Sequence, residues 1–215
     1  MALDAWLYWI DHAAIAVFAI SGALVASRKQ MDAVGFILIA VVTGFGGGTM
    51  RDLLLGRTPV FWLRAPDLLA VAMVAAVLVF FTAHLFNNRF RALLWADAVG
   101  LSIYAVLGAE IALIAGANPW AAVILGVVTA TFGGIVRDVI CNEIPLILRR
   151  EIYATAAAAG AAVFVILRLE GVWREPAFLA GALTCFLIRA AAIQRGWSLP
   201  GYRPRPGRDY PDGER

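Results

Sequence analysis

Seven apolar stretches follow one another along the chain, and each is about as long as a helix that crosses a membrane. They cover residues 10–27, 33–50, 67–86, 95–114, 119–138, 152–168 and 177–194. A helix needs about 17–25 mainly apolar residues to span the hydrocarbon core of a bilayer. The segments between the stretches are short and contain proline, asparagine and charged residues. This pattern predicts an all-α, polytopic membrane protein with seven transmembrane helices.

The composition agrees with that interpretation. Of the 215 residues, 62% are hydrophobic and 15% are charged, whereas a soluble domain is typically about 45–50% apolar and about 25% charged. We therefore expect residues 1–194 to form a single transmembrane domain in the cell (inner) membrane. Residues 195–215 are rich in proline, glycine and arginine. Such a segment buries too little apolar surface to order itself, so we expect a flexible polar tail.

The two halves of the chain are related by a shift of 86 residues without a gap. The coinciding residues are Asp11 and Asp97, Gly22 and Gly108, Thr43 and Thr129, Gly47-Gly48 and Gly133-Gly134, Arg51-Asp52 and Arg137-Asp138, and Pro59 and Pro145. A shared Gly-Gly-x-x-Arg-Asp-x6-Pro block is too specific for chance similarity between apolar sequences, so we infer a duplication.

Each copy, at about 10–86 and about 95–168, contains three predicted helices. Because three is an odd number, the second copy enters the membrane from the opposite side, and the halves are predicted to be inverted repeats. The stretch 177–194 is then an unpaired seventh helix. Of the 18 lysines and arginines, thirteen fall on the side that contains Arg28 and the tail. The positive-inside rule therefore places the N-terminus outside and the C-terminus in the cytoplasm.

Glycines are concentrated in the second helix of each copy, at Gly46, Gly47 and Gly48 and again at Gly133 and Gly134. Each glycine in a helix costs about 1 kcal/mol relative to alanine. We expect both helices to kink or break there and to face a polar cavity between the halves, because non-helical backbone in a membrane must be buried or hydrated. The alternative is that the glycines serve close helix packing.

An Arg-Asp pair follows each glycine block by one helical turn, at Arg51-Asp52 and at Arg137-Asp138. Inserting a charge into hydrocarbon costs about 2.5–3.5 kcal/mol, so such residues normally face a bundle interior or water. Because residues i and i+1 do not face each other on a helix, each arginine is expected to find its partner elsewhere. We predict one charged cluster near each mouth of a shared path. The alternative is a pair of anchors that hold the helix ends at the interface.

Glu110 stands midway along the fourth stretch, far from any predicted loop. An acid inside a membrane helix is a candidate for function, and a protonated, buried glutamate is the alternative. Together with the two Arg-Asp pairs, Glu110 gives the predicted path a negative formal charge, which favours cations.

Several other functions are not supported by the sequence. The two cysteines and two histidines lack the paired spacing of a metal site, so no structural metal and no cofactor are expected. No nucleophile–base pair can be identified, and we predict no enzyme. The basic residues lie between apolar runs and in the tail rather than along one face, so nucleic acid is not an expected partner.

The paired glycine and Arg-Asp blocks resemble those of the prokaryotic trimeric intracellular cation channels, a group that overlaps bacterial membrane proteins described as glycine transporters. The resemblance covers residues 5–193 and is most specific in the segment GGGTMRDLLLGRTPVFW. It implies a homotrimer in membrane lipid, in which each subunit has an hourglass pore for monovalent cations such as potassium. It also implies that the second and fifth helices line that pore, with help from the first and fourth.

The resemblance assigns pore-lining or gating roles to the residues of the two matching blocks. These are Gly46, Gly47, Gly48, Arg51, Asp52, Gly133, Gly134, Arg137 and Asp138. The Lys-Glu-Val segment of animal members is absent from this sequence, so the regulation by lipid or calcium that is attached to it is not carried over. The second block also has fewer glycines, and a milder break is expected there.

Two functional hypotheses stay open at this point. The first is a potassium-permeable cation channel with one pore per subunit. The second is a secondary transporter for a small solute such as glycine, because inverted repeats with broken helices also serve alternating access. Both need the same cavity between the halves, and the residues do not separate them.

Overall fold

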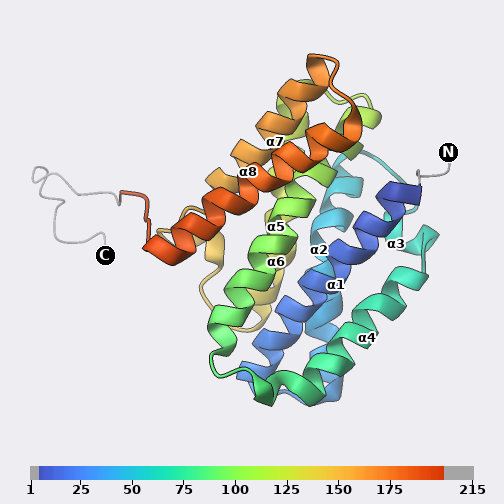
Figure 1. Ribbon diagram of the computed structural model, residues 1–215. Helices are drawn as coiled ribbons and strands as arrows, with labels where there is room; N and C mark the ends of the chain where they lie inside the picture. The colour runs from blue at the N-terminus through green and yellow to red at the C-terminus, as the bar shows by residue number, and fades with distance from the viewer. Residues whose placement is uncertain (1–4, 201–215) are drawn as a thin grey trace, which may run out of the picture.

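The computed structural model describes residues 5–200, and all the regular secondary structure of that part except one isolated β-bridge is helical (Figure 1). The long helices are α1 (Ala5–Arg28), α2 (Ala33–Leu54), α4 (Asp67–Thr82), α5 (Arg89–Ile114), α6 (Pro119–Ile140), α7 (Ala154–Leu169) and α8 (Arg174–Arg195). Three short elements join them: α3 (Phe61–Arg64) and the 3-10 helices η1 (Ala83–Leu85) and η2 (Leu146–Leu148). Each long helix overlaps one predicted stretch, whereas the three short elements were not predicted.

Polar residues set the starts of several helices. Asp32, Asn88 and Asn118 each accept a hydrogen bond from the backbone N–H three residues later, at 2.8, 2.9 and 2.8 Å, which satisfies a donor that the first helical turn leaves free. At the other end, Gly196 follows α8 with a φ of +67°. Glycine adopts this left-handed conformation without strain and so ends the helix.

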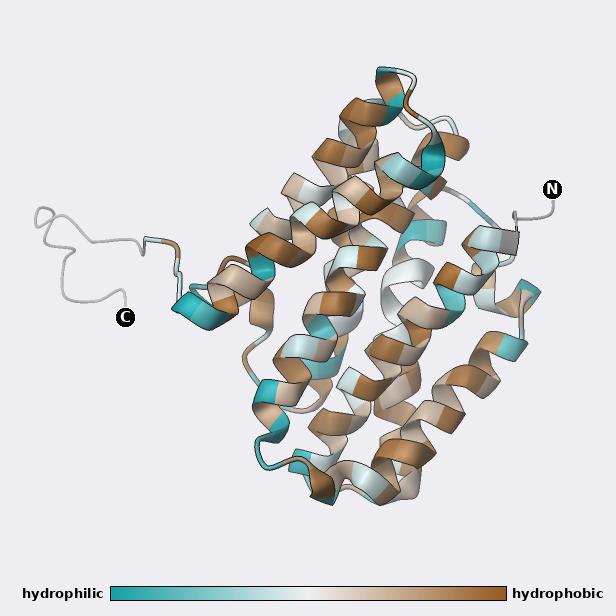
Figure 2. Cartoon of the chain, in the orientation of Figure 1, coloured by the Kyte–Doolittle hydropathy of each residue, from teal (hydrophilic) through white to brown (hydrophobic). Residues whose placement is uncertain are grey.

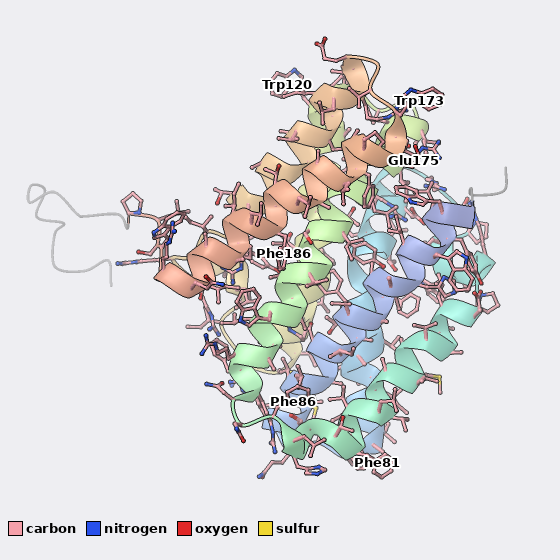
Figure 3. The ribbon with its side chains drawn as sticks, in the orientation of Figure 1. Phe81, Phe86, Trp120, Trp173, Glu175 and Phe186 are labelled. Atoms are coloured by element: carbon pink, nitrogen blue, oxygen red, sulfur yellow. The ribbon has the colours of Figure 1, made fainter. Side chains whose placement is uncertain are left out.

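In the hydropathy colouring, hydrophobic residues predominate along the helices, and many of the hydrophilic residues lie near helix ends and connections (Figure 2). Six helices (α1, α2, α5, α6, α8 and α4 with η1) are long and apolar enough to cross a membrane, and α7 is apolar but has only 16 residues. Trp120 and Trp173, which are exposed, lie at the end where α6 and α8 begin, opposite Phe81 and Phe86 (Figure 3). Tryptophan at helix ends is typical of the membrane–water interface. The chain is an all-helical membrane protein.

The packing of the helices follows the 86-residue offset. Helix α1 packs against α2 and α4, and α5 packs against α6 and α7. These two groups of three meet through the pairs α1–α5 and α2–α6, which occupy equivalent places in the two copies. Helices α2 and α6 also begin and end at positions that are 86 residues apart. Helix α8 packs against α5 and α7, so it contacts the second group.

The predicted breaks at the glycines are wrong. Helix α2 is α-helical without interruption through Gly46, Gly47 and Gly48, and α6 is α-helical through Gly133 and Gly134. The glycines instead let the two helices touch. A Cβ on Gly47 would lie 1.9 Å from the carbonyl oxygen of Thr129, and one on Gly133 would lie 2.1 Å from that of Thr43. Close contact with the neighbouring helix offsets the low helix propensity of glycine, so the backbone does not need to unwind.

The predicted tail, 195–215, lies partly outside the described residues. Helix α8 continues to Arg195. Beyond it, Ser198 forms an antiparallel β-bridge with Glu151, and the N–H of Leu199 donates to the carbonyl of Arg150 at 3.1 Å. The start of the segment is therefore paired with the residues before α7, while residues 201–215 are not described.

Candidate functional site

Two clusters of buried charge lie beyond the glycine contact of α2 and α6, each one turn further along its own helix. We call the group around Arg51 and Asp52 the first cluster and the group around Arg137 and Asp138 the second cluster. All four residues are 2% exposed or less. Their side chains therefore face the protein interior, as predicted. Both clusters stand on helices that are fixed against each other by backbone contact at Gly47 and Gly133.

In the first cluster, Arg51 binds the aspartate that follows it in sequence. Its Nε and Nη2 atoms donate to Oδ1 of Asp52 at 2.9 and 2.8 Å. The other carboxylate oxygen accepts from the backbone N–H of Phe61 at 2.8 Å, which fixes the start of α3. The guanidinium carbon also lies 5.5 Å from the centre of the Phe61 ring, a distance at which a cation–π interaction is favourable.

The second cluster repeats this arrangement and extends it. Nε of Arg137 donates to Oδ1 of Asp138 at 2.8 Å, and the second oxygen of Asp138 accepts from the N–H of Leu146 at 3.1 Å. In addition, Nη1 of Arg137 donates to Oγ of Ser21 at 2.8 Å and to Oδ1 of Asp97 at 3.0 Å. Arg137 therefore connects α1, α5 and α6.

The expectation that each arginine must find its partner elsewhere is wrong for the first contact of both residues. Neighbouring residues on a helix point in different directions, but the arginine side chain is long enough to turn sideways to the next carboxylate. Charge-assisted hydrogen bonds of this kind are short and strong. Of these two arginines, only Arg137 also forms an ion pair with an acid on another helix within the described residues, namely Asp97.

Asp11 and Asp97, which coincide in the duplication, were not predicted as site residues. Asp97 is fully buried against Arg137. Asp11 accepts a hydrogen bond from the hydroxyl of Tyr104 at 3.2 Å, which joins α1 to α5. It also interacts electrostatically with Arg51 and Asp52, so we count it with the first cluster. The signal that could have found both residues is their coincidence in the 86-residue repeat, since an acid inside a membrane helix is uncommon.

Tyr153 lies just before α7 and closes the second cluster. A Cβ on Gly134 would lie 3.4 Å from the Tyr153 hydroxyl, 3.6 Å from Nη2 of Arg137 and 3.7 Å from Oδ1 of Asp97, so these groups surround the same point. Arg189 on α8 lies over the Tyr153 ring, 5.2 Å from its centre, and donates to Oε2 of Glu151 at 2.7 Å.

Glu110 forms ion pairs with arginines that belong to neither cluster. It is 2% exposed, and its carboxylate oxygens lie 2.9 Å from Nε of Arg174 and 3.8 Å from Nε of Arg168. These ion pairs join α5 to the end of α7 and the start of α8. The structure thus pairs Glu110 with two arginines that the sequence did not connect with it.

An apolar groove of about 320 Å³ lies beside the glycine contact and is open to the surface, where the exposed Leu53 forms part of its lining. It is lined by Val41, Val42, Phe45, Gly46, Thr49, Met50, Leu53, Trp62, Leu69 and Phe132. Gly46 is the one predicted site residue in this lining. Gly46 therefore faces an apolar groove rather than the polar cavity expected between the halves, while Gly47 lies against the backbone of α6.

No group of three or more histidine, cysteine, aspartate or glutamate side chains in residues 5–200 is arranged to hold a metal ion. What the two clusters can do chemically is to keep carboxylates inside the membrane. Four aspartates, Asp11, Asp52, Asp97 and Asp138, are held there with three fully buried arginines, Arg51, Arg137 and Arg189, and the last of these pairs with Glu151. Such an interior is polar, charged and slightly acidic.

Comparison with known proteins identifies the family. A family model described as glycine transporter matches residues 8–84 and 94–168, and these two matches begin 86 residues apart. The inner membrane protein YadS of Escherichia coli K12, a UPF0126 protein, is 43% identical over 91% of this chain and 96% of its own length. A UPF0126 membrane protein of Vibrio cholerae is 42% identical over 94% of this chain and 85% of its own length.

Solved structures agree. The TRIC trimeric intracellular cation channel orthologue from Rhodobacter sphaeroides is 54% identical and superposes with a TM-score of 0.87, over 89% of this chain and 98% of the other. A prokaryotic TRIC channel crystallised in 0.5 M KCl is 31% identical, with a TM-score of 0.85 over 92% of this chain and all of the other. The resemblance predicted from the glycine and Arg-Asp blocks is confirmed, and the chain, which also matches the family model described as glycine transporter, belongs to the TRIC family.

Proposed function

We propose that the chain is a potassium-permeable channel for monovalent cations, with one pore in each subunit of a homotrimer. The observation that carries the proposal is the recurrence of a buried Arg–Asp cluster, at the 86-residue offset, on each of the two helices that touch through Gly47 and Gly133. The relatives of known structure are TRIC cation channels, and one of them is described as trimeric.

The proposed pore runs between two inverted three-helix repeats, α1–α2–α4 and α5–α6–α7, with α8 as a seventh membrane helix. The equivalent contacts of the two groups support this arrangement. Arg28, Arg89 and Arg149 lie at one end of the bundle. Arg89 donates to the carbonyl of Ser27, and the guanidiniums of Arg28 and Arg149 both lie over the ring of Phe90. The positive-inside rule makes that end cytoplasmic and leaves the N-terminus outside.

The continuous helices change the mechanism that the sequence predicts. The carbonyl groups of an intact helix are engaged in its own hydrogen bonds, so the glycine blocks do not supply free carbonyls to a cation. The carboxylates of the two clusters take that role, because rings or pairs of acidic side chains favour cations over anions. In this proposal the contact between α2 and α6 is the narrowest point of the path, and Arg51, Asp52, Arg137 and Asp138 lie on either side of it.

The experiment is single-channel recording from the purified protein in planar bilayers with unequal KCl concentrations on the two sides. We expect unitary currents whose reversal potential lies near the potassium equilibrium potential. Asp11→Asn should move that potential toward the chloride value, and Leu38→Asn, on the exposed face of α2, is the matched control. No unitary current, or a chloride-selective one, contradicts the proposal.

A second candidate function is a secondary transporter for a small solute such as glycine, because the matching family model carries that description. The two candidates differ in rate and saturation. Uptake of radiolabelled glycine into proteoliposomes that saturates with concentration, without currents in the bilayer experiment, favours the transporter. Potassium currents without glycine uptake favour the channel.

A further inference from the structure

The chain that leaves α8 turns back and pairs with the segment that leads into α7, so two distant parts of the sequence lie side by side (Figure 1). Ser198 and Glu151 form an antiparallel β-bridge, and the N–H of Leu199 donates to the carbonyl of Arg150 at 3.1 Å. We call Ser198 and Leu199 the strap, and the residues from Arg150 to Tyr153 the covering segment. The strap holds the covering segment through its backbone.

Arg189 on α8 holds the covering segment from the side of the helix bundle. Its Nη2 donates to Oε2 of Glu151 at 2.7 Å, and its Nη1 donates to the carbonyl of Ile152 at 3.2 Å. Because Arg189 is buried, its bond to the carboxylate is charge-assisted and sheltered from water. Helix α8 and the strap that follows it therefore both fix the covering segment, and neither belongs to the duplicated part of the chain.

Tyr153 is the residue that the covering segment places against the second cluster. It is buried, and its ring lies under the guanidinium of Arg189 at 5.2 Å. Its hydroxyl and Nη2 of Arg137 face one point beside Gly134, at 3.4 and 3.6 Å from the place of a Cβ. The hydroxyl also interacts electrostatically with Asp97. Access to the second cluster from this side therefore requires Tyr153 to move.

The start of α7 has little else to keep Tyr153 in place. Asp32, Asn88 and Asn118 cap the starts of α2, α5 and α6 with a side-chain hydrogen bond. Tyr153, which precedes α7, makes no such bond within the part of the chain that the structure describes. A helix start without a cap opens more easily. The position of Tyr153 thus depends on the strap and on Arg189.

The first copy is built differently at the equivalent position. The residue 86 positions before Tyr153 is Asp67, which is exposed at the start of α4. Asp67 accepts a hydrogen bond from the hydroxyl of Tyr8 and lies 2.7 Å from Nε2 of His12. The first copy therefore fixes this position through side chains of α1, whereas the second copy fixes it through α8 and a backbone pairing.

We propose that the strap controls access to the second cluster. While Leu199 is bonded to Arg150, Tyr153 covers the cluster; when the strap is released, the covering segment moves and that mouth of the path opens. The inference rests on the proposed function, because it takes the second cluster as part of an ion path. One backbone hydrogen bond changes such an equilibrium about two- to tenfold. The strap therefore shifts the population of open channels and does not lock the pore.

The test compares two full-length variants at one position by single-channel recording in potassium. Leu199→Pro removes the N–H that bonds to Arg150, while Leu199→Ala keeps it and removes a side chain that is largely exposed. We expect the ratio of open to closed time to rise about two- to tenfold in Leu199→Pro, with the unitary conductance and reversal potential of the wild type. Leu199→Ala should behave as the wild type.

Hydrogen–deuterium exchange with mass spectrometry measures the covering segment without a current. Peptides that contain residues 150–153 should exchange about two- to tenfold faster in Leu199→Pro than in Leu199→Ala, while peptides from α5 exchange equally. Equal exchange of the covering segment in the two variants, or equal open times, overturns the proposal. Absence of current from the wild type contradicts the proposed function, and the gating role falls with it. The exchange difference then still decides whether the strap holds the covering segment.

Discussion

The two charged clusters share a sequence motif but use it differently. In the first cluster, the hydrogen bonds of Arg51 go to Asp52 on the same helix, and its guanidinium lies over the Phe61 ring of α3. In the second cluster, Arg137 bonds to Asp138 and also to Ser21 and Asp97 on two other helices. The same arginine–aspartate pair is thus a local contact in one copy and a connection among three helices in the other.

Access to solvent differs as well. Arg57, which is about one-quarter exposed, lies 3.9 Å from Asp52, so the first cluster reaches the surface through this residue. Partial burial lowers the pKa of Arg57, while the carboxylate of Asp52 opposes that shift. The second cluster is closed by Tyr153, which Arg189 covers from α8. Helix α8, which has no counterpart in the duplication, therefore makes the two copies unequal by covering one of the clusters.

The largest expected effect comes from removing the connecting arginine. Arg137→Gln leaves Asp97 and Asp138 buried without their cation, and breaking a buried pair in this way costs about 3–5 kcal/mol. Arg51→Gln should cost less, about 1–3 kcal/mol. In that variant Asp52 still accepts a hydrogen bond from the N–H of Phe61 and still has the cation of Arg57 nearby. Thermal unfolding of both variants in detergent measures the difference. Equal losses would show that the contacts of Arg137 to α1 and α5 contribute little.

A smaller effect is expected at the glycine contact. Gly47→Ala would place a methyl group 1.9 Å from the Thr129 carbonyl and force α2 and α6 apart, with a loss of about 1–3 kcal/mol. Gly44→Ala, in the same helix, meets nothing closer than 3.5 Å and should be neutral or stabilising. The midpoint of thermal unfolding measures both. If Gly47→Ala is as stable as Gly44→Ala, the helices do not touch at this point.

The smallest effect is expected for one hydrogen bond in the first cluster. Tyr104→Phe removes the donor to Asp11 and keeps the ring that stacks on Phe18, so the loss should be about 0.5–1.5 kcal/mol. Because Asp11 is then less well held, potassium conductance should change while the fold is retained. Unfolding measurements combined with bilayer recordings test this. A loss as large as that of Arg137→Gln would contradict the distinction between the clusters.

The sequence predicted the helices and the buried charges well. Apolar length alone located the seven long helices, of which six are long and apolar enough to cross a membrane. The offset between copies predicted that Arg51 and Arg137 would occupy equivalent places. In the structure, each arginine forms an ion pair with the aspartate that follows it in sequence. These features follow from local sequence patterns, which can be identified without knowing which helices pack together.

Other features depend on which helices meet. Glycine propensity predicted broken helices, but the contact of Gly47 and Gly133 with opposite carbonyls keeps α2 and α6 intact. Asp97 could not be assigned to Arg137 because the two residues are 40 positions apart in the sequence. Only the packing of α5 against α6 brings them within hydrogen-bond distance. Likewise, the pairing of Glu110 with Arg174 requires the turn between α7 and α8 to fold back on α5.

Modification of a single cysteine during recording tests most directly whether the first cluster lies in the ion path. Asp11→Cys, in bilayers, is treated with a membrane-impermeant, positively charged methanethiosulfonate reagent, and the wild-type protein, whose two cysteines are buried, is the control. We expect the potassium current of Asp11→Cys to fall on modification while that of the wild type stays constant. An unchanged current after verified modification of residue 11 would contradict the account, because the clusters would then lie outside the path of the ions.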